Sequence, residues 1–343
     1  MPTNTAAWLN NKHGRFEVGE APYPSPSAGQ VVIRNRAVAM NPLEWIIQVE
    51  GNLFYGWLDY PTVIGSDTAG EVVEVGSGVT RFQVGDRVLG HAVGTDKDTK
   101  SAAEGTFQEY TVVLERLTAP MPETLSFEEA ATLPLAVSTA SSALFESAWL
   151  GLQLPSANPT ATGQTVLVWG GSTSVGSQAI QLAVAAGYEV IATASPRNFA
   201  SLTKLGAALV FDYNSPTVEK DIIAALRSRT LAGAVSFGTT GAPACVRIAG
   251  ASTGNRFVAI GTPPVSFGPL ADGGMATRVR VTAWSPHTGG GISSDGTSTA
   301  TSGASTAWTA STRALPTGPA SPRAPYPETT SRTSSPRASR DPM

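Results

Sequence analysis

The hydrophobic pattern in the first third of the chain is that of a β-rich domain. Between Gly29 and about Pro120, short runs rich in β-branched residues are separated by turn residues. These runs cover residues 31–34, 70–76, 86–90 and 107–113. Strands that follow one another so closely predict a compact, β-barrel-like domain.

The pattern changes after residue 128. An alanine-rich, helix-favouring segment covers residues 128–150, and Pro134 must either bend one of its helices or begin one. From Gln164 to about Pro264, apolar runs of strand length alternate with helical stretches. This alternation predicts a parallel sheet with helices on its faces, and therefore an α/β domain after the β-rich one.

The last zone, residues 285–343, has neither period. Ser, Thr, Ala, Pro, Gly and Arg dominate it, and its only branched aliphatic residues are Ile292 and Leu315. So little apolar surface cannot offset the entropy of ordering, so we expect a disordered tail. It is either a modified Ser/Thr/Pro-rich tail or an aberrant one from a frameshift or unspliced intron. The chain thus divides into residues 1–130, 131–284 and 285–343.

A glycine-rich turn early in the α/β zone has the context of a dinucleotide-binding unit. Residues 165–169 predict a strand and 170–176 the turn. Residues 177–186 predict a helix that ends at Gly187, and 189–194 a second strand. In such a unit, the N–H groups and the dipole of the helix N-terminus face a pyrophosphate. The alternative is an ordinary strand-turn-helix of another α/β protein.

The fingerprint of this unit is incomplete. Its first and last glycines fall on Gly171 and Gly176, but its middle position is Thr173. Hydroxyl groups can donate hydrogen bonds to phosphate oxygens. We therefore expect Ser172, Thr173 and Ser174 to replace part of the close approach that glycine allows.

The end of the second strand indicates which dinucleotide is bound. An acidic residue there would hydrogen-bond the ribose 2′-hydroxyl of NAD. The strand instead leads into Ser195, Pro196, Arg197 and Asn198, with no carboxylate. Arg197 offers a planar donor fork suited to a 2′-phosphate, so the sequence favours NADPH over NADH. The alternative is that Arg197 is a solvated surface charge.

Composition excludes several other classes of protein. The 343 residues are 41% hydrophobic and 14% charged, which suits a globular chain with two domains. A net charge of −3 gives no reason to expect nucleic acid as a partner. The sequence has no membrane-length apolar run and no secretory leader, so we expect a cytoplasmic protein. Its one cysteine, Cys245, cannot form an intramolecular disulfide.

The order of these segments resembles the medium-chain dehydrogenase/reductase superfamily over roughly residues 5–265. Residues 41–45, 64–72 and 84–88 match its GroES-like catalytic domain, which precedes a Rossmann domain. Residues 169–176 and 193–199 look like its fungal zinc-independent branch. That branch includes trans-acting enoyl reductases that serve polyketide synthases, and related quinone-type reductases.

The resemblance implies a reaction without a metal. Zinc-dependent members carry a Cys and a His-Glu pair where this chain has Asn41-Pro42 and Ser66-Asp67. Three zinc ligands cannot be assembled from these residues. Many members of the branch also have a lysine after the tryptophan, but here Ile46 follows Trp45, so the proton donor stays unassigned.

The resemblance also supplies the remaining site residues. Thr139 is expected to donate a hydrogen bond to the substrate, and the alternative is a core hydroxyl satisfied by nearby backbone. The residues expected to border substrate are Val137, Ser138, Thr139, Ala140, Ser141 and Leu144. With the fingerprint, the expected cofactor contacts are Pro42, Trp45, Gly171, Ser172, Thr173, Ser174, Val175, Gly176, Ser195, Arg197, Asn198, Tyr213, Ile260 and Gly261.

Three functions follow as hypotheses. The first is an NADPH-dependent reductase that transfers hydride to an α,β-unsaturated or carbonyl substrate, small or carrier-bound, in secondary metabolism. A polyketide synthase would be its partner, and the protein a monomer or homodimer. The second is a general quinone reductase. The third is an inactive, truncated NADPH-binding protein, because relatives complete the catalytic domain with a final segment that residues 285–343 do not resemble.

Overall fold

The β-rich first part of the chain folds into two antiparallel sheets. The computed structural model describes residues 2–51, 55–238, 241–261 and 279–281, so the predicted tail 285–343 lies outside the described residues. One sheet has the order β2-β1-β4, formed by β1 (Asn4–Leu9), β2 (Phe16–Ala21) and β4 (Thr62–Val63). The other has the order β7-β3-β5-β6-β8, formed by β3 (Gln30–Ala39), β5 (Asp67–Val75), β6 (Arg87–His91), β7 (Tyr110–Leu114) and β8 (Thr118–Pro120).

The second sheet surrounds a core of β-branched side chains. Val31 and Ile33 of β3, Val72 of β5 and Val88 of β6 are buried together with Val113 of β7. Burial of such side chains on one face supplies most of the free energy that holds the strands together. The four apolar runs read from the sequence therefore correspond to β3, β5, β6 and β7.

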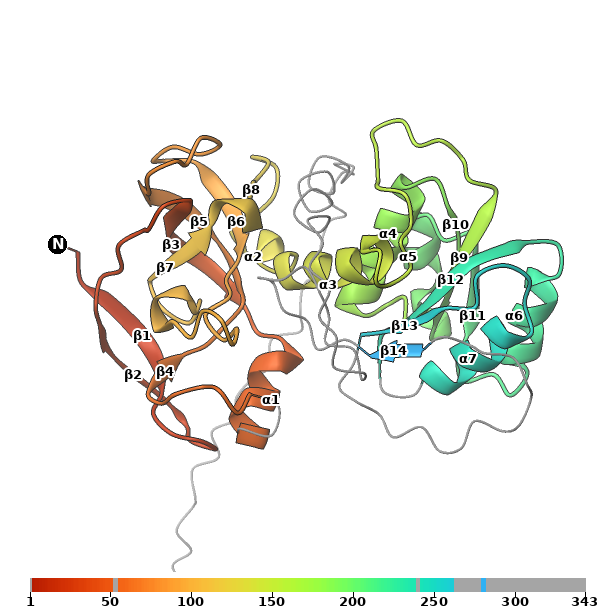
Figure 1. Cartoon of the computed structure of the whole chain (residues 1–343), viewed down its shortest axis with the longest axis horizontal. Helices are drawn as coiled ribbons and strands as arrows, with labels where there is room; N and C mark the ends of the chain where they lie inside the picture. The colour runs from red at the N-terminus through yellow and green to blue at the C-terminus, as the bar shows by residue number, and fades with distance from the viewer. Residues whose placement is uncertain (1, 52–54, 239–240, 262–278, 282–343) are drawn as a thin grey trace, which may run out of the picture.

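Helix α1 (Pro42–Glu50) packs beside the strands of this part. Two further helices lead from it toward the parallel sheet of the second part. Helix α2 (Phe127–Ala130) is capped by Ser126, whose hydroxyl accepts a hydrogen bond from the Glu129 N–H at 3.2 Å. Helix α3 (Pro134–Phe145) begins at Pro134, where the missing N–H costs nothing. Figure 1 shows α3 between the antiparallel sheets of the first part and the parallel sheet of the second.

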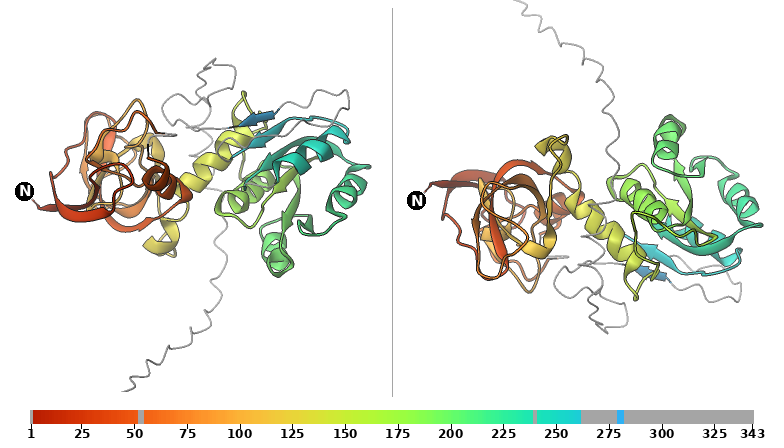
Figure 2. Two further views of the ribbon diagram at one scale, coloured as in Figure 1. Left: turned by 90° about the horizontal axis from the view of Figure 1, so that it is seen from below. Right: turned by 90° about the horizontal axis from the view of Figure 1, so that it is seen from above.

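The second part is a parallel sheet with the strand order β11-β10-β9-β12-β13-β14. The strands are β9 (Gln164–Trp169), β10 (Glu189–Ala194), β11 (Leu209–Asp212), β12 (Thr230–Ser236), β13 (Val258–Ile260) and β14 (Val279–Val281). The helices are α4 (Ser174–Ala185), α5 (Phe199–Lys204), α6 (Val218–Leu226) and α7 (Ala242–Gly250). The views in Figure 2 show helices on both faces of the sheet. The order reverses on either side of β9, as in doubly wound dinucleotide-binding folds.

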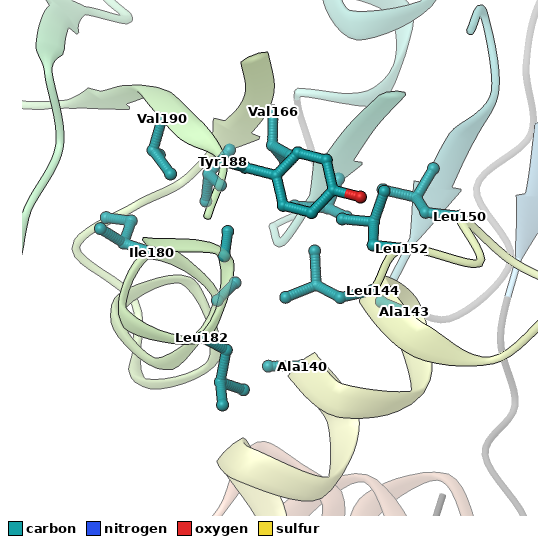
Figure 3. Packing of buried hydrophobic residues seen from close by; sticks show 14 of the residues in the cluster. Ala140, Ala143, Leu144, Leu150, Leu152, Val166, Ile180, Leu182, Tyr188 and Val190 are labelled. Atoms are coloured by element: carbon teal, nitrogen blue, oxygen red, sulfur yellow. The ribbon is translucent and has the colours of Figure 1, made fainter. Parts of the chain in front are cut away.

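Helix α3 contributes to the hydrophobic core on one face of this sheet. Ala140 and Leu144 of α3 are fully buried and pack with Ile180 of α4 and with Val166 and Val190 of the sheet (Figure 3). The linking helix is therefore part of the second domain's core.

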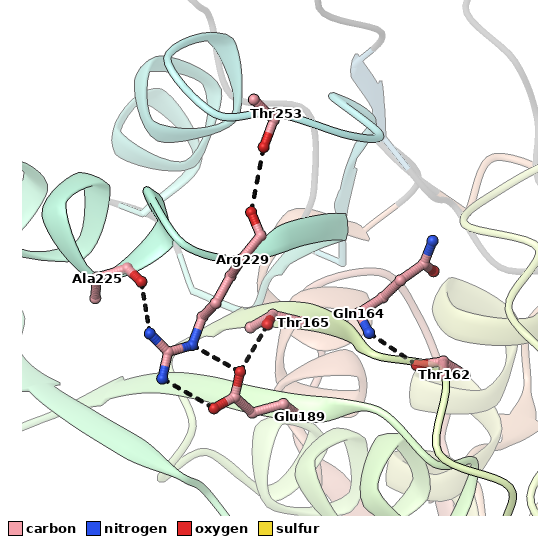
Figure 4. Close-up of polar contacts among 7 residues, drawn as sticks. All are labelled: Thr162, Gln164, Thr165, Glu189, Ala225, Arg229 and Thr253. Carbon is pink, nitrogen blue, oxygen red and sulfur yellow. Dashed lines mark hydrogen bonds and ion pairs between the residues drawn. The ribbon is translucent and has the colours of Figure 1, made fainter.

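A polar clamp holds the amino ends of the central strands together (Figure 4). The Arg229 guanidinium donates to both carboxylate oxygens of Glu189, at 2.7 and 3.1 Å. Thr165 of β9 donates to the same carboxylate at 2.8 Å. The Arg229 hydrogen bond lowers the pKa of the Glu189 carboxyl group below its usual value. The clamp fixes the edge of the sheet opposite to the glycine-rich turn.

Truncation of Leu144 tests whether α3, which links the two parts of the chain, also belongs to the core of the second domain. We expect Leu144→Ala to lower the free energy of unfolding by about 2–5 kcal/mol, because it leaves a cavity in a tightly packed core. The matched control is Leu154→Ala, at a leucine that is 42% exposed. Urea denaturation monitored by circular dichroism measures both. Equal effects of the two substitutions would contradict the packing described for α3.

Candidate cofactor and active site

The glycine-rich turn lies at the carboxyl end of β9, where the strand order reverses. Gly170 has a φ of +81°, and a Cβ there would collide with the carbonyl oxygen of Phe237. A Cβ at Gly176 would collide with the carbonyl oxygen of Gly170. A Cβ at Gly171 would lie 2.9 Å from Leu202. These glycines let the turn pack tightly against both flanking strands and α4, as close approach to a pyrophosphate requires.

Thr173 occupies the middle fingerprint position and is the N-cap of α4. Its hydroxyl accepts a hydrogen bond from the Gly176 N–H at 3.0 Å and donates one to the Gly170 carbonyl at 2.8 Å. The cap explains why α4 begins at Ser174, three residues before the start predicted from the sequence.

The open end of this helix can receive an anion. Residues at the first positions of a helix have N–H groups without an intrahelical acceptor. Ser174 and Val175 take these positions, and Ser172 and Ser174 are exposed beside them. Because the Thr173 hydroxyl is engaged with its own turn, backbone N–H groups and the two serines are the donors left for a phosphate.

The end of β10 carries the residues predicted to select the cofactor. Asn198 donates to the Ser195 hydroxyl at 3.2 Å and so fixes the turn in which Arg197 is exposed. Arg197 makes no ion pair with any described residue. Tyr213, 43% exposed, follows β11 on the same edge of the sheet. Arg197 and Tyr213 therefore lie on the same edge of the parallel sheet, after β10 and β11.

A carboxylate that the sequence analysis did not single out is also present here. Asp212 ends β11 and pairs with Ala194 of β10. Its Oδ1 accepts hydrogen bonds from the Asn214 N–H at 2.9 Å and from the Asn214 side chain at 3.2 Å. The turn after β11 therefore already binds this carboxylate. In the sequence, Asp212 could have been found from its position at the end of a short apolar run, next to Tyr213.

The carboxyl ends of β12 and β13 form the other side of the site. Gly261 donates its N–H to the Ser236 carbonyl at 3.0 Å. A Cβ at Gly261 would lie 2.7 Å from the Phe237 ring and 3.7 Å from Cγ2 of Thr139. Ile260 is fully buried in the core around α6 and α7, so only its backbone faces this edge. The structure therefore brings Thr139 and Gly261 together.

Thr139 is the half-buried member of the predicted substrate set. Its hydroxyl donates to the Leu135 carbonyl at 2.9 Å, which is the backbone-satisfied arrangement weighed as the alternative for this residue. The other members, Val137, Ser138, Ala140, Ser141 and Leu144, are all buried. Ala140 and Leu144 face the core of the second domain and Val137 that of the first, so these three side chains do not line an open site.

Asn41, Glu44, Ser66 and Asp67 form a polar network. Two of its stretches, Asn41-Pro42 and Ser66-Asp67, correspond to the zinc-ligand positions of the zinc-dependent proteins that the sequence resembles. Asn41 donates its side-chain N–H to Asp67 Oδ2 at 2.9 Å and its backbone N–H to Glu44 Oε2 at 2.6 Å. Ser66 donates to Glu44 Oε1 at 2.9 Å. Pro42 and Trp45, predicted to touch the cofactor, are exposed on α1, Trp45 to 59%. Among the residues described, no group of three or more His, Cys, Asp or Glu side chains could hold a metal ion.

Burial shifts the titration of the groups in and near this network. Desolvation raises the pKa of Asp67 to about 7 and raises that of Glu44. It lowers the pKa of His91 to about 3, so this imidazole is neutral at physiological pH. His91 Nδ1 lies 3.0 Å from the Ser138 hydroxyl of α3. With a pKa of about 7, Asp67 changes its charge near neutral pH.

Comparison with known proteins agrees with this architecture. The alcohol dehydrogenase GroES-like domain family matches residues 27–123. Dehydrogenase pigH of Monascus ruber is 57% identical over 268 residues, which cover 77% of this chain and 72% of that protein. Trans-enoyl reductase himH of Aspergillus japonicus is 41% identical over 278 residues, 81% of this chain and 77% of that protein.

Solved structures resemble the fold in the same way. The crystal structure of an alcohol dehydrogenase superfamily protein from Novosphingobium aromaticivorans has a TM-score of 0.64 and 28% identity, covering 78% of this chain and 75% of that one. The two domains and the turn at β9 define an oxidoreductase whose class uses nicotinamide cofactors. The chain belongs to the medium-chain dehydrogenase/reductase superfamily. In the described part of the chain, no helix is long and apolar enough to cross a membrane.

The cap at Thr173 can be tested by substitution. We expect Thr173→Ala to lower the free energy of unfolding by about 1 kcal/mol and to weaken nucleotide binding, because the first turn of α4 loses its hydroxyl acceptor. Thr173→Ser keeps that acceptor and is the matched control. Urea denaturation gives the stability, and NADPH fluorescence titration gives the affinity. An alanine variant that matches wild type in both measurements would contradict the role of the cap.

Proposed function

We propose that the chain is an NADPH-dependent reductase that transfers hydride to an α,β-unsaturated substrate, with a carrier-bound enoyl thioester as the substrate class. The observation that carries the proposal is that Thr139 lies beside Gly261, on the same edge of the sheet as the glycine-rich turn. Cγ2 of Thr139 faces Gly261, and its hydroxyl bonds to the Leu135 carbonyl, so a change of rotamer or of hydroxyl direction would be needed to turn the hydroxyl toward a bound nicotinamide. The relative named trans-enoyl reductase himH supports an enoyl substrate. We extend this to a carrier-bound thioester, with a polyketide synthase as the partner that would present it.

The residues of the chain would bind the cofactor, orient the substrate against it and polarise the substrate carbonyl group. NADPH, when bound, would supply a hydride from C4 of its nicotinamide. The N-terminus of α4, with Ser172 and Ser174 beside it, would hold its pyrophosphate over the glycine-rich turn, and Arg197 would hold its 2′-phosphate. The Thr139 hydroxyl would rotate its proton from the Leu135 carbonyl to the substrate carbonyl oxygen. A hydrogen bond there stabilises the negative charge that develops on the enolate.

No zinc takes part in this proposal. The Asn41 side-chain amide and the Ser66 hydroxyl replace the ligand types that hold catalytic zinc, and both donate hydrogen bonds to buried carboxylates. Substrate polarisation therefore falls to hydrogen-bond donors. The proton that the α-carbon takes up after hydride transfer would come from water.

Substrate assays test the reaction. We expect purified enzyme to oxidise NADPH with a butenoyl thioester, at a rate that 1,10-phenanthroline leaves unchanged, and Thr139→Val to lower kcat about tenfold or more by removing the donor. Absorbance at the NADPH band follows turnover. Turnover of a benzoquinone alone would favour the general quinone reductase. NADPH binding with no turnover of either substrate would favour the inactive binding protein.

Cofactor selection depends on Arg197. We expect Arg197→Ala to weaken NADPH binding about tenfold or more while NADH binding changes little, because only NADPH carries the 2′-phosphate. Arg227→Ala is the matched control, since Arg227 is also exposed but precedes β12 at the opposite edge of the sheet. Fluorescence titration with both dinucleotides measures the change. Equal losses for NADPH and NADH would contradict the role of Arg197.

A further inference from the structure

Helix α3 has no cap within its own sequence. Its N-cap residue is Leu133, which has no side-chain oxygen and no cap hydrogen bond. Pro134 follows as the first helical residue and has no N–H. The Leu135 N–H is therefore the first donor of the helix, and no helical carbonyl precedes it to accept its hydrogen bond.

A carboxylate from the other domain supplies the missing acceptor. Asp67 Oδ1, at the first position of β5, accepts the Leu135 N–H at 2.6 Å. A negative charge at this end also interacts favourably with the dipole of the helix. The second oxygen, Oδ2, accepts from the Asn41 side chain at 2.9 Å. One buried carboxyl group thus joins β5, the start of α1 and the first turn of α3.

The same residue of α3 holds the Thr139 side chain. The Leu135 carbonyl accepts the Thr139 hydroxyl at 2.9 Å, one turn later in the helix. The two peptide groups that flank Leu135 are therefore fixed from opposite sides, one by Asp67 and the other by Thr139. The contact of His91 Nδ1 with Ser138, at 3.0 Å, is a second polar tie between the barrel strands and α3.

We propose that Asp67 is a positioning residue for the reaction, which holds the first turn of α3, and with it the Thr139 side chain, in place at the cofactor edge through the backbone of Leu135. This inference rests on the proposed function, in which Thr139 hydrogen-bonds the substrate. In this proposal Asp67 acts through Leu135 and Thr139 and does not itself contact substrate or cofactor. Loss of its carboxylate lets the first turn of α3 fray and releases Thr139 from its fixed rotamer, although the fold persists.

Steady-state kinetics with the enoyl thioester tests the proposal. We expect Asp67→Ala to lower kcat about tenfold or more, because misplacement of a group that contacts the substrate is costly, and to change KM for NADPH by no more than about twofold. Asp67→Asn keeps an oxygen acceptor for the Leu135 N–H and retains most of kcat. The matched control is Ser126→Ala. It removes the N-cap of α2, which lies away from Leu135, and should leave kcat unchanged.

A double substitution separates positioning from general loss of structure. If Asp67 acts through Thr139, Asp67→Ala adds little to the loss of kcat already caused by Thr139→Val. An unchanged kcat in Asp67→Ala would overturn the proposal. So would a double variant whose loss is the product of the two single losses.

An activity-free measurement keeps this test distinct from that of the proposed function. In methyl NMR of wild type with the cofactor absent, Thr139 should show a single χ1 rotamer. Asp67→Asn and Ser126→Ala should keep it, whereas Asp67→Ala should show rotamer averaging. If wild type reduces no enoyl thioester, the proposed function fails, and the NMR result alone decides the positioning role. A Thr139 rotamer that stays fixed in Asp67→Ala would refute it.

Discussion

The hydrogen bond between Asp67 and the Leu135 N–H ties the first domain to the helix that both domains share. Helix α3 is buried on two sides, with Val137 in one core and Leu144 in the other. Tightly packed interiors resist rotation of such a helix, because any turn would open cavities on both sides. The polar tie at its start fixes the remaining freedom, and with it the place of Thr139 relative to the parallel sheet.

The parallel sheet gives its two ends different tasks. At the amino end, Arg229 and Glu189 hold neighbouring strands together with a bidentate ion pair. At the carboxyl end, Gly170 and Gly176 have no room for a Cβ, so at the start of α4 the turn packs closely against its own backbone and that of Phe237. Backbone donors lose no side-chain entropy when they bind an anion. Rigidity at one end therefore supports close approach of a ligand at the other.

The sequence predicted those elements whose hydrophobic pattern and turn residues lie close together along the chain. The strands β3 and β9, the glycine-rich turn and the family itself could be read directly. The start of α4 was predicted three residues late, because the hydroxyl of Thr173 had been interpreted as a phosphate donor rather than as a cap. Strands β1 and β2 were not predicted, although they pair with each other nearby in the sequence, and the pairing of β1 with Val63 joins residues far apart in the chain.

The candidate site shows the same division. Ala140 and Leu144 were predicted to border substrate, but a helix that is apolar on most sides does not reveal which face meets which domain. The tie from Asp67 joins residues 68 positions apart and leaves no local signal. Burying a carboxyl group is costly, and its raised pKa reflects that desolvation. Because both of its oxygens accept hydrogen bonds, the cost is offset only when α1 and α3 are in place together. Asp67 thus makes the geometry of the active edge depend on the assembly of both domains.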